Sequence, residues 1–137
     1  MNNFDIHKSG GIIIRDKKLL VERSFGKEFF IAPGGSIEDG ETPKQALVRE
    51  LQEEFAIDVK EDDLTEFGVF FAEAAGKEGK TVRMDVFMVR GWDGEPRPNS
   101  EVEEIRWITS ELPEGMRVGS IFEHEVLPRL KDLGLID

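Results

Sequence analysis

The segment Pro43–Phe55 limits the fold more than any other part of the chain, because it combines helix-start signals with a helical pattern of apolar residues. Thr42 is a residue type that caps helices, proline suits the first helical position, and Gln45 can bond back to the cap amide. At about 100° per residue, one side of the helix collects the apolar side chains of this segment. They are Leu47, Val48, Leu51 and Phe55. We therefore predict a helix with one buried face.

A different arc of the same helix carries the carboxylates of Glu50, Glu53 and Glu54. Like charges at this spacing destabilise a helix by a few tenths of a kcal/mol per pair, and only Arg49 is placed to offset them. Magnesium and calcium prefer oxygen ligands, and magnesium typically keeps waters and phosphate oxygens beside one or two carboxylates. The spacing suits a hydrated divalent ion, whereas the alternative for such a cluster taken alone is a solvated surface face.

Short apolar or β-branched runs predict strands in the rest of the chain. The runs are residues 10–14, 19–23, 29–32, 64–71, 82–90 and 104–108. Charged residues 15–18 favour a hairpin between the first two runs. Pro33-Gly34-Gly35 stops the third, and a loop follows up to Thr42. Residues 91–100 are rich in proline and glycine and form a predicted surface loop.

A second helix is predicted at residues 120–132. Ser120 is the expected cap with Glu123 in the third position, Pro128 should kink the helix, and Gly134 should end it. Its apolar stripe consists of Phe122, Val126, Leu127, Leu130 and Leu133.

The composition restricts the partners that the chain can bind. Acidic residues outnumber basic ones by 29 to 18, and the net charge of -11 repels DNA and anionic membranes, so a phosphate ligand needs intervening cations. Without cysteine there is no disulfide or thiolate metal site, and no apolar run resembles a signal peptide or a membrane span. We expect one domain over residues 1–137, in a cytoplasmic monomer or homodimer.

The stretch from Gly35 to Ile57 resembles the Nudix box, G-x5-E-x7-R-E-U-x-E-E-x-G-U, in which U is a bulky aliphatic residue. Every defined position matches except Ala56, where the family has glycine. Alanine at this helix end would have to adopt a left-handed conformation, which costs about 1 kcal/mol of stability. The order of strands and helices is also similar to that of the family. The resemblance therefore implies an α/β fold, the Nudix αβα sandwich with a central mixed β-sheet between two main helices.

The resemblance also implies a divalent-metal centre with Mg²⁺, or alternatively Mn²⁺, as cofactor. Its implied metal ligands are the carbonyl of Gly35 and the side chains of Glu50, Glu53, Glu54 and, as in MutT-like members, Glu101. Arg49 and Glu41 would form an ion pair that orients the helix. The implied catalytic set is Glu53, Glu54, Arg49, Glu41 and Glu101. The general base is either Glu53 or Glu101, and the alternative for Glu101 is a solvated position in an acidic run.

Four residues are candidates for substrate binding, each with a plain structural alternative: Arg23, Phe30, Phe122 and His124. Core packing is the alternative for the two phenylalanines, and a surface position is the alternative for the other two. The implied reaction is metal-dependent hydrolysis of a diphosphate linkage in a nucleoside diphosphate derivative.

Subfamily markers act mainly by absence. The chain has Glu73 where relatives acting on ADP-ribose tend to have proline. It has no tyrosine, whereas relatives acting on dinucleoside polyphosphates carry one near that position, and it lacks the coenzyme A signature upstream of the box. By elimination, we predict a (d)NTP pyrophosphohydrolase that gives NMP and pyrophosphate. The alternatives are a Nudix-fold nucleotide-binding module without turnover, suggested by Ala56, and a hydrolase of another substrate such as a nucleotide sugar.

Overall fold

The computed structural model describes residues 4–74 and 79–137. Its strands are β1 (Ile6–Ile12), β2 (Ile14–Arg15), β3 (Lys18–Ser24), β4 (Gly34–Ser36), β5 (Leu64–Glu73), β6 (Thr81–Val89) and β7 (Val102–Ile108). Its helical elements are α1 (Pro43–Phe55), the short η1 (Glu61–Asp63), the π-helical η2 (Phe122–Val126) and α2 (Leu127–Asp132). None of these described helices has the length and apolar composition needed to cross a bilayer.

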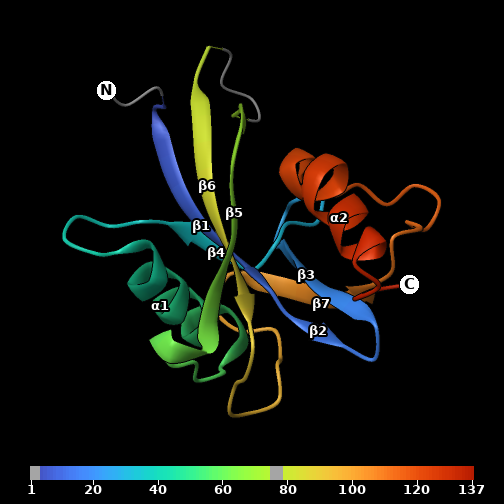
Figure 1. Cartoon of the computed structure of the whole chain (residues 1–137), viewed down its shortest axis with the longest axis horizontal. Helices are drawn as coiled ribbons and strands as arrows, with labels where there is room; N and C mark the ends of the chain where they lie inside the picture. The colour runs from blue at the N-terminus through green and yellow to red at the C-terminus, as the bar shows by residue number, and fades with distance from the viewer. Residues whose placement is uncertain (1–3, 75–78) are drawn as a thin grey trace.

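The strands form two sheets. A 4-stranded sheet has the order β4-β1-β6-β5 and is mixed, because β1 and β6 are parallel and the other pairs are antiparallel. The other is a 3-stranded antiparallel sheet with the order β2-β3-β7. The strands lie between α1 on one side and α2 on the other (Figure 1). The predicted α/β sandwich, with a mixed sheet and two main helices, is therefore confirmed.

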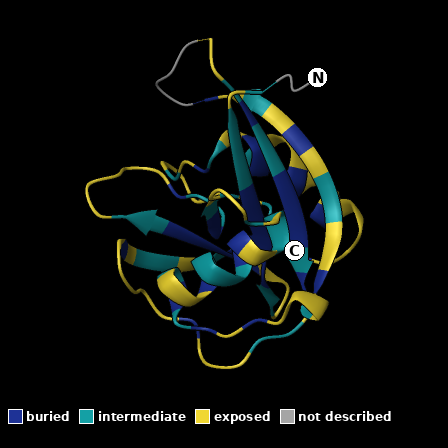
Figure 2. Cartoon of the chain, turned by 90° about the vertical axis from the view of Figure 1, so that its left-hand side faces the viewer, coloured by how far each residue is buried: buried dark blue, intermediate teal, exposed yellow. Residues whose placement is uncertain are grey.

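Each main helix packs on its own apolar cluster. Leu47, Leu51 and Phe55 of α1 are fully buried, with Val48 partly buried beside them, which confirms the predicted core face. The second cluster packs the C-terminal helical segment against the other side of the strands, through Phe122, Val126, Leu127 and Leu130. In Figure 2 the buried residues gather along the strands, while the loops are largely exposed.

The start and end of α1 follow the predicted signals. Thr42 accepts the backbone N–H of Gln45 at 3.1 Å, and the Gln45 side chain accepts the backbone N–H of Thr42 at 3.0 Å, so the capping box is confirmed. Ala56 ends the helix in the left-handed conformation, with φ 56° and ψ 36°, as predicted. Its N–H donates to the Gln52 carbonyl at 3.0 Å.

Replacing Ala56 with glycine should raise the free energy of unfolding by about 1 kcal/mol, because glycine adopts the left-handed conformation without a Cβ clash. In a thermal melt with EDTA, we expect the Tm to rise by about 3–5 °C. Ala46→Gly, inside the same helix, is the control and should lower stability by about 1 kcal/mol or more. An unchanged Tm for Ala56→Gly would show that alanine is not strained at this position.

The loop of residues 91–100, predicted as such, binds the last turn of α1. The N–H of Arg97 donates to the Phe55 carbonyl at 3.2 Å, and that of Asn99 donates to the Glu54 carbonyl at 3.0 Å. The side-chain amide of Asn99 donates to the Glu53 carbonyl at 2.9 Å. The loop therefore satisfies carbonyl groups that a helix end leaves without intrahelical partners.

The region before α1 differs from its prediction. Gly34–Ser36, expected to belong to a loop, forms β4 and pairs with β1. The close pairing needs glycine, because Gly34 has φ 132° and a Cβ there would lie 2.0 Å from the Ser9 carbonyl oxygen. The predicted strand 29–32 is reduced to isolated bridges, Ile31 with Glu22 and Phe30 with Val118.

The other strands match their predictions with shifted ends. The hairpin joins β2 and β3 across Asp16 and Lys17, both with positive φ, and the run 10–14 is divided between β1 and β2. The run 104–108 forms β7, and the runs 64–71 and 82–90 form β5 and β6. The segment that joins β5 and β6 includes residues 75–78, which lie outside the described residues.

The C-terminal helix also departs from the expected regular form. Before Pro128, η2 has the wider π turn, in which the Leu127 N–H donates to the Phe122 carbonyl. Proline has no N–H and its ring clashes with the carbonyl four residues earlier, so a wider turn relieves this contact. The prediction that Leu133 belongs to the buried stripe is wrong, because the helix ends at Asp132 and Leu133 is 63% exposed.

Candidate active site

Arg49 lies at the centre of the acidic face of α1. Its Nε and Nη2 donate to the two Glu41 carboxylate oxygens at 2.8 and 2.9 Å. Its Nη1 donates to Glu50 Oε1 at 2.8 Å and lies 3.6 Å from Glu53 Oε2. Nη2 also donates to the Ser36 carbonyl at 3.2 Å. The ion pair between Arg49 and Glu41 is therefore present, and it ties α1 to the loop that precedes it.

The Arg49 guanidinium has a clear electrostatic effect on Glu41. Its hydrogen bonds, followed by one from the backbone N–H of Glu38, lower the pKa of Glu41 from 4.5 to about 2. Because the folded-state pKa is below the unfolded value, Glu41 stabilises the fold fully above pH 4.5, and this contribution is lost as the pH falls through about 2.

We expect the stability difference between the parent and Glu41→Gln to be largest above pH 4.5 and to shrink as the pH approaches 2. Urea unfolding with EDTA across this range measures the difference. Glu38→Gln is a matched control, because Glu38 is exposed and lies 3.8 Å from Arg49, so it should show a small difference throughout. A difference for Glu41→Gln that is the same at both ends of the range would contradict the prediction.

The two glycines of β4 bring the backbone against the glutamates of α1. Glu54 Oε1 accepts the backbone N–H of Gly34 at 3.0 Å. A Cβ at Gly35 would lie 2.8 Å from the Glu50 carboxyl carbon, so a larger residue there would displace this carboxylate from its present position. The Pro-Gly-Gly segment and the helix therefore meet at Glu50 and Glu54.

Glu22 of β3 is a site residue that the sequence reasoning missed. It is 1% exposed, and its carboxyl group is in hydrogen-bond contact with that of Glu54. Burial first, and the mutual contact second, raise the pKa of Glu22 well above its ordinary value, and burial also raises that of Glu54. The sequence signal that could have identified Glu22 is its position in the strand. Every second side chain of a strand points to the same side, and Glu22 is two residues after the buried Leu20.

The remaining glutamates lie around this buried pair. Burial raises the pKa of Glu50, against the opposing effect of Arg49. The negative charge of Glu101 also raises the pKa of Glu22 and Glu50, so this exposed residue lies near enough to act on the site. Glu53 is the most open of the helix carboxylates, with its side chain 52% exposed. The charge of Glu101 therefore acts on Glu22 and Glu50.

These residues fit a hard divalent ion. Among residues 4–74 and 79–137, no three acidic or histidine side chains form a ready-made cage for an ion. Magnesium does not need one, since it typically binds one or two carboxylates and keeps water or phosphate oxygens as its other ligands. Glu22 Oε2 is buried and has no hydrogen-bond partner within the described part of the chain, and the space over Gly35 holds the Glu50 carboxylate. Both observations favour a cation at this position.

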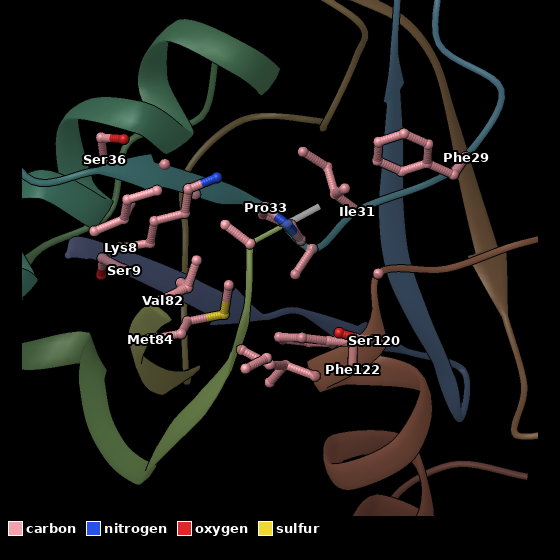
Figure 3. A pocket seen from close by; sticks show the side chains of 18 of the residues that line it. Lys8, Ser9, Phe29, Ile31, Pro33, Ser36, Val82, Met84, Ser120 and Phe122 are labelled. Carbon is pink, nitrogen blue, oxygen red and sulfur yellow. The ribbon is translucent and has the colours of Figure 1, made fainter. Parts of the chain in front are cut away.

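A cavity of about 620 Å³ opens beside Gly34 and Gly35. Figure 3 shows that side chains from β1, β6 and the start of the C-terminal helix surround it, with Phe29 at its edge. The walls are mainly apolar, with Ile31, Met84 and Phe122 among them. A cavity of this size can hold a nucleotide-sized ligand next to the glutamates.

The structure separates the four candidate substrate residues. Phe122 is buried and lines the cavity. Phe30 is not among the lining residues and packs in the core, while its neighbour Phe29, which sequence reasoning did not select, faces the cavity. This agrees with side chains of an extended segment pointing alternately to opposite sides.

The other two candidates, Arg23 and His124, are not among the residues that line the cavity. Arg23 donates to Glu103 at 2.7 Å and to Glu104 at 3.0 Å, so its guanidinium already has acidic partners. His124 is exposed and lies 3.5 Å from Glu123, outside the cavity.

Comparisons with known proteins agree with this arrangement. A model of the NUDIX domain matches residues 6–128. An 8-oxo-dGTP diphosphatase of Proteus vulgaris is 40% identical over 100 residues, which are 69% of this chain and 85% of that protein. An ADP-ribose pyrophosphatase of Methanocaldococcus jannaschii is 30% identical over 119 residues, 84% of this chain and 66% of the relative.

A solved structure, the MutT NUDIX hydrolase from Burkholderia pseudomallei, superposes with a TM-score of 0.68 and 25% identity over 80% of this chain and 87% of that one. The family match covers the strands and helices that position the glutamates, the glycine segment and the cavity. The chain therefore belongs to the NUDIX domain family and is a pyrophosphohydrolase of the Nudix type.

Proposed function

We propose that the chain hydrolyses a nucleoside triphosphate to the monophosphate and pyrophosphate, with Mg²⁺ or Mn²⁺. The observation that carries the proposal is the position of the α1 glutamates, which lie against Gly34 and Gly35 at the edge of the apolar cavity. A base in the cavity would then have its phosphates beside the glutamates. The 8-oxo-dGTP diphosphatase among the relatives supports a triphosphate substrate.

The residues that would hold the ion are Glu50, Glu53 and Glu54 of α1 and the carbonyl of Gly35, with Glu101 at the edge of the site. Nudix hydrolases generally need a divalent metal ion. When bound, such an ion neutralises phosphate charge and lowers the pKa of a coordinated water. Arg49 would keep Glu50 in place through its bond of 2.8 Å, while Glu41 fixes the guanidinium.

Glu53 is the proposed general base. Its half-exposed carboxylate can reach a water molecule, and its contact with Arg49 is longer than that of Glu50. The oxygen of the water would form a bond to the α- or β-phosphorus while the P–O anhydride bond between these two groups breaks, which releases the monophosphate and pyrophosphate. The proton of the water would pass to Glu53 and then to solvent. Glu101 is the alternative base, because it lies at the edge of the same site.

The cavity supports a nucleotide rather than a purely anionic ligand. Phe29 and Phe122 offer aromatic surface to a base, and Ser24 and Ser120 offer hydroxyl groups to its polar edges or to the ribose. Lys8 and Lys27 also line the cavity and provide positive charge in a protein whose net charge is -11.

A panel of substrates tests the proposal. It should contain NTPs, dNTPs and their oxidised forms, ADP-ribose, nucleotide sugars and dinucleoside polyphosphates, each with Mg²⁺ and with Mn²⁺. We expect the highest kcat/KM for a triphosphate, with monophosphate and pyrophosphate released in equal amounts. A preference for ADP-ribose or a nucleotide sugar would overturn the substrate, and nucleotide binding without any turnover would favour a binding module.

A further inference from the structure

Glu22 occupies a fixed place in the centre of the fold. Its backbone N–H donates to the Ile31 carbonyl at 2.9 Å, and its carbonyl accepts the Ile31 N–H at 2.7 Å. On its other side, β3 pairs with β7, with Glu22 opposite Ile105. The residue is 1% exposed, so its carboxyl group is shielded from solvent. Its position toward α1 is therefore built into the fold.

The neighbours of this carboxyl group are acidic. Glu54 is in hydrogen-bond contact, and the charges of Glu50 and Glu101 also act on Glu22. The nearby arginines have other partners, since Arg49 donates to Glu41 and Glu50, and Arg23 donates to acids of β7. Among the residues that the structure describes, the Oε2 atom of Glu22 has no hydrogen-bond partner. A buried carboxyl group with an unpaired oxygen is unfavourable unless something else supplies positive charge or a donor.

We propose that Glu22 is an additional ligand of the divalent ion, facing the α1 glutamates from β3. A cation between Glu22 and Glu54 would give the unpaired Oε2 a partner and would compensate the charge of two carboxyl groups that lie in contact. This inference rests on the proposed function, because it needs an ion at the glutamate face. It adds a ligand that lies outside the Gly35–Ile57 segment and that the glutamate spacing of α1 does not reveal.

The competing explanation is that Glu22 is a structural acid, permanently protonated and bonded to Glu54. The two explanations differ in how Glu22→Gln behaves. The amide group of glutamine can donate to Glu54 as a protonated acid does, so a structural role would survive this change. A neutral amide is a much weaker ligand for a hard divalent ion than a carboxylate, so a ligand role would not survive it.

The test measures Mn²⁺ binding to the full chain by electron paramagnetic resonance of the free ion, and thermal unfolding with EDTA or with Mn²⁺. We expect Glu22→Gln to weaken Mn²⁺ binding by about tenfold or more. Its Tm in EDTA should equal or exceed that of the parent, whereas the increase in Tm that Mn²⁺ gives the parent should be reduced. The matched control is Glu103→Gln, the same chemical change at an exposed position of β7, which should change the Kd by less than about twofold.

Unchanged Mn²⁺ affinity in a folded Glu22→Gln protein would overturn the inference. If the proposed metal site itself is wrong, the result is different, because the parent protein then binds no Mn²⁺. Glu54→Gln is the positive control, since it removes a proposed ligand and should weaken Mn²⁺ binding. If Glu22→Gln does not fold, Glu22→Asp replaces it, because aspartate keeps the charge but withdraws the carboxylate by one methylene group. Weakened binding by the folded aspartate variant would then support the ligand role, and parental affinity would overturn it.

Discussion

Glu53→Gln should lower kcat for the best triphosphate substrate by about 10²–10⁴-fold, which is the usual contribution of a general base. Glutamine keeps the size of the side chain but cannot accept the proton of the attacking water. The fold should be unaffected, because the Glu53 side chain is 52% exposed and its nearest cation, Arg49 Nη1, is 3.6 Å away. Steady-state kinetics at saturating Mg²⁺, together with a thermal melt, measure both effects.

A matched control for this variant is Glu38→Gln, which removes another carboxylate near Arg49 at 3.8 Å but outside α1. It should keep the parental kcat to within about twofold. If Glu53→Gln retains parental activity, Glu53 is not the base. The same measurement on Glu101→Gln then decides whether the acidic residue ahead of β7 has that role.

Arg49→Ala should reduce both activity and stability. The guanidinium bonds Glu41, Glu50 and the Ser36 carbonyl, so its loss leaves two facing carboxylates without their cation. We expect a fall of about 10–100-fold in Mn²⁺ affinity or activity, typical of a residue that orients metal ligands. Unfolding in urea with EDTA should show a loss of about 2 kcal/mol, the scale of a hydrogen bond to a charged group.

Arg49→Lys distinguishes charge from geometry. Lysine keeps the positive charge but cannot bond both oxygens of Glu41 while also reaching Glu50. We expect this variant to recover part of the stability and little of the metal affinity. Full recovery of both properties would show that the planar fork of Arg49 has no special role, and that a nearby positive charge is sufficient.

The helix of the candidate site was predictable because its signals are local. Thr42, Pro43 and Gln45 specify its start through contacts within a few residues, and the apolar face of α1 follows from periodicity alone. The left-handed Ala56 was also predictable, since the family pattern has glycine at that position. Local rules therefore predicted α1 from its capping box to its last residue.

Residues that depend on contacts between distant segments were not predictable in the same way. The glycine segment pairs with β1 only because Gly34 lets the two backbones approach closely, and a Pro-Gly-Gly sequence ordinarily predicts a turn. Glu22 looked like an ordinary charged residue near a strand end, because the groups around it come from distant parts of the chain, namely Glu54 of α1, Ile31 and β7. In the same way, the sequence could not show which of Phe29 and Phe30 lines the cavity, because this depends on the side to which each side chain of an irregular segment points.

The loop of residues 91–100 has an entropic consequence for ligand binding. Helix ends ordinarily fray, and ordering them on binding reduces affinity. Here the carbonyls of Glu53, Glu54 and Phe55 are bonded to Asn99 and Arg97, so the last turn is ordered before any ligand arrives. The backbone of this turn therefore loses its conformational entropy when the chain folds and not when a ligand binds. An ion or nucleotide that binds at the glutamates then has to restrict mainly the torsions of their side chains.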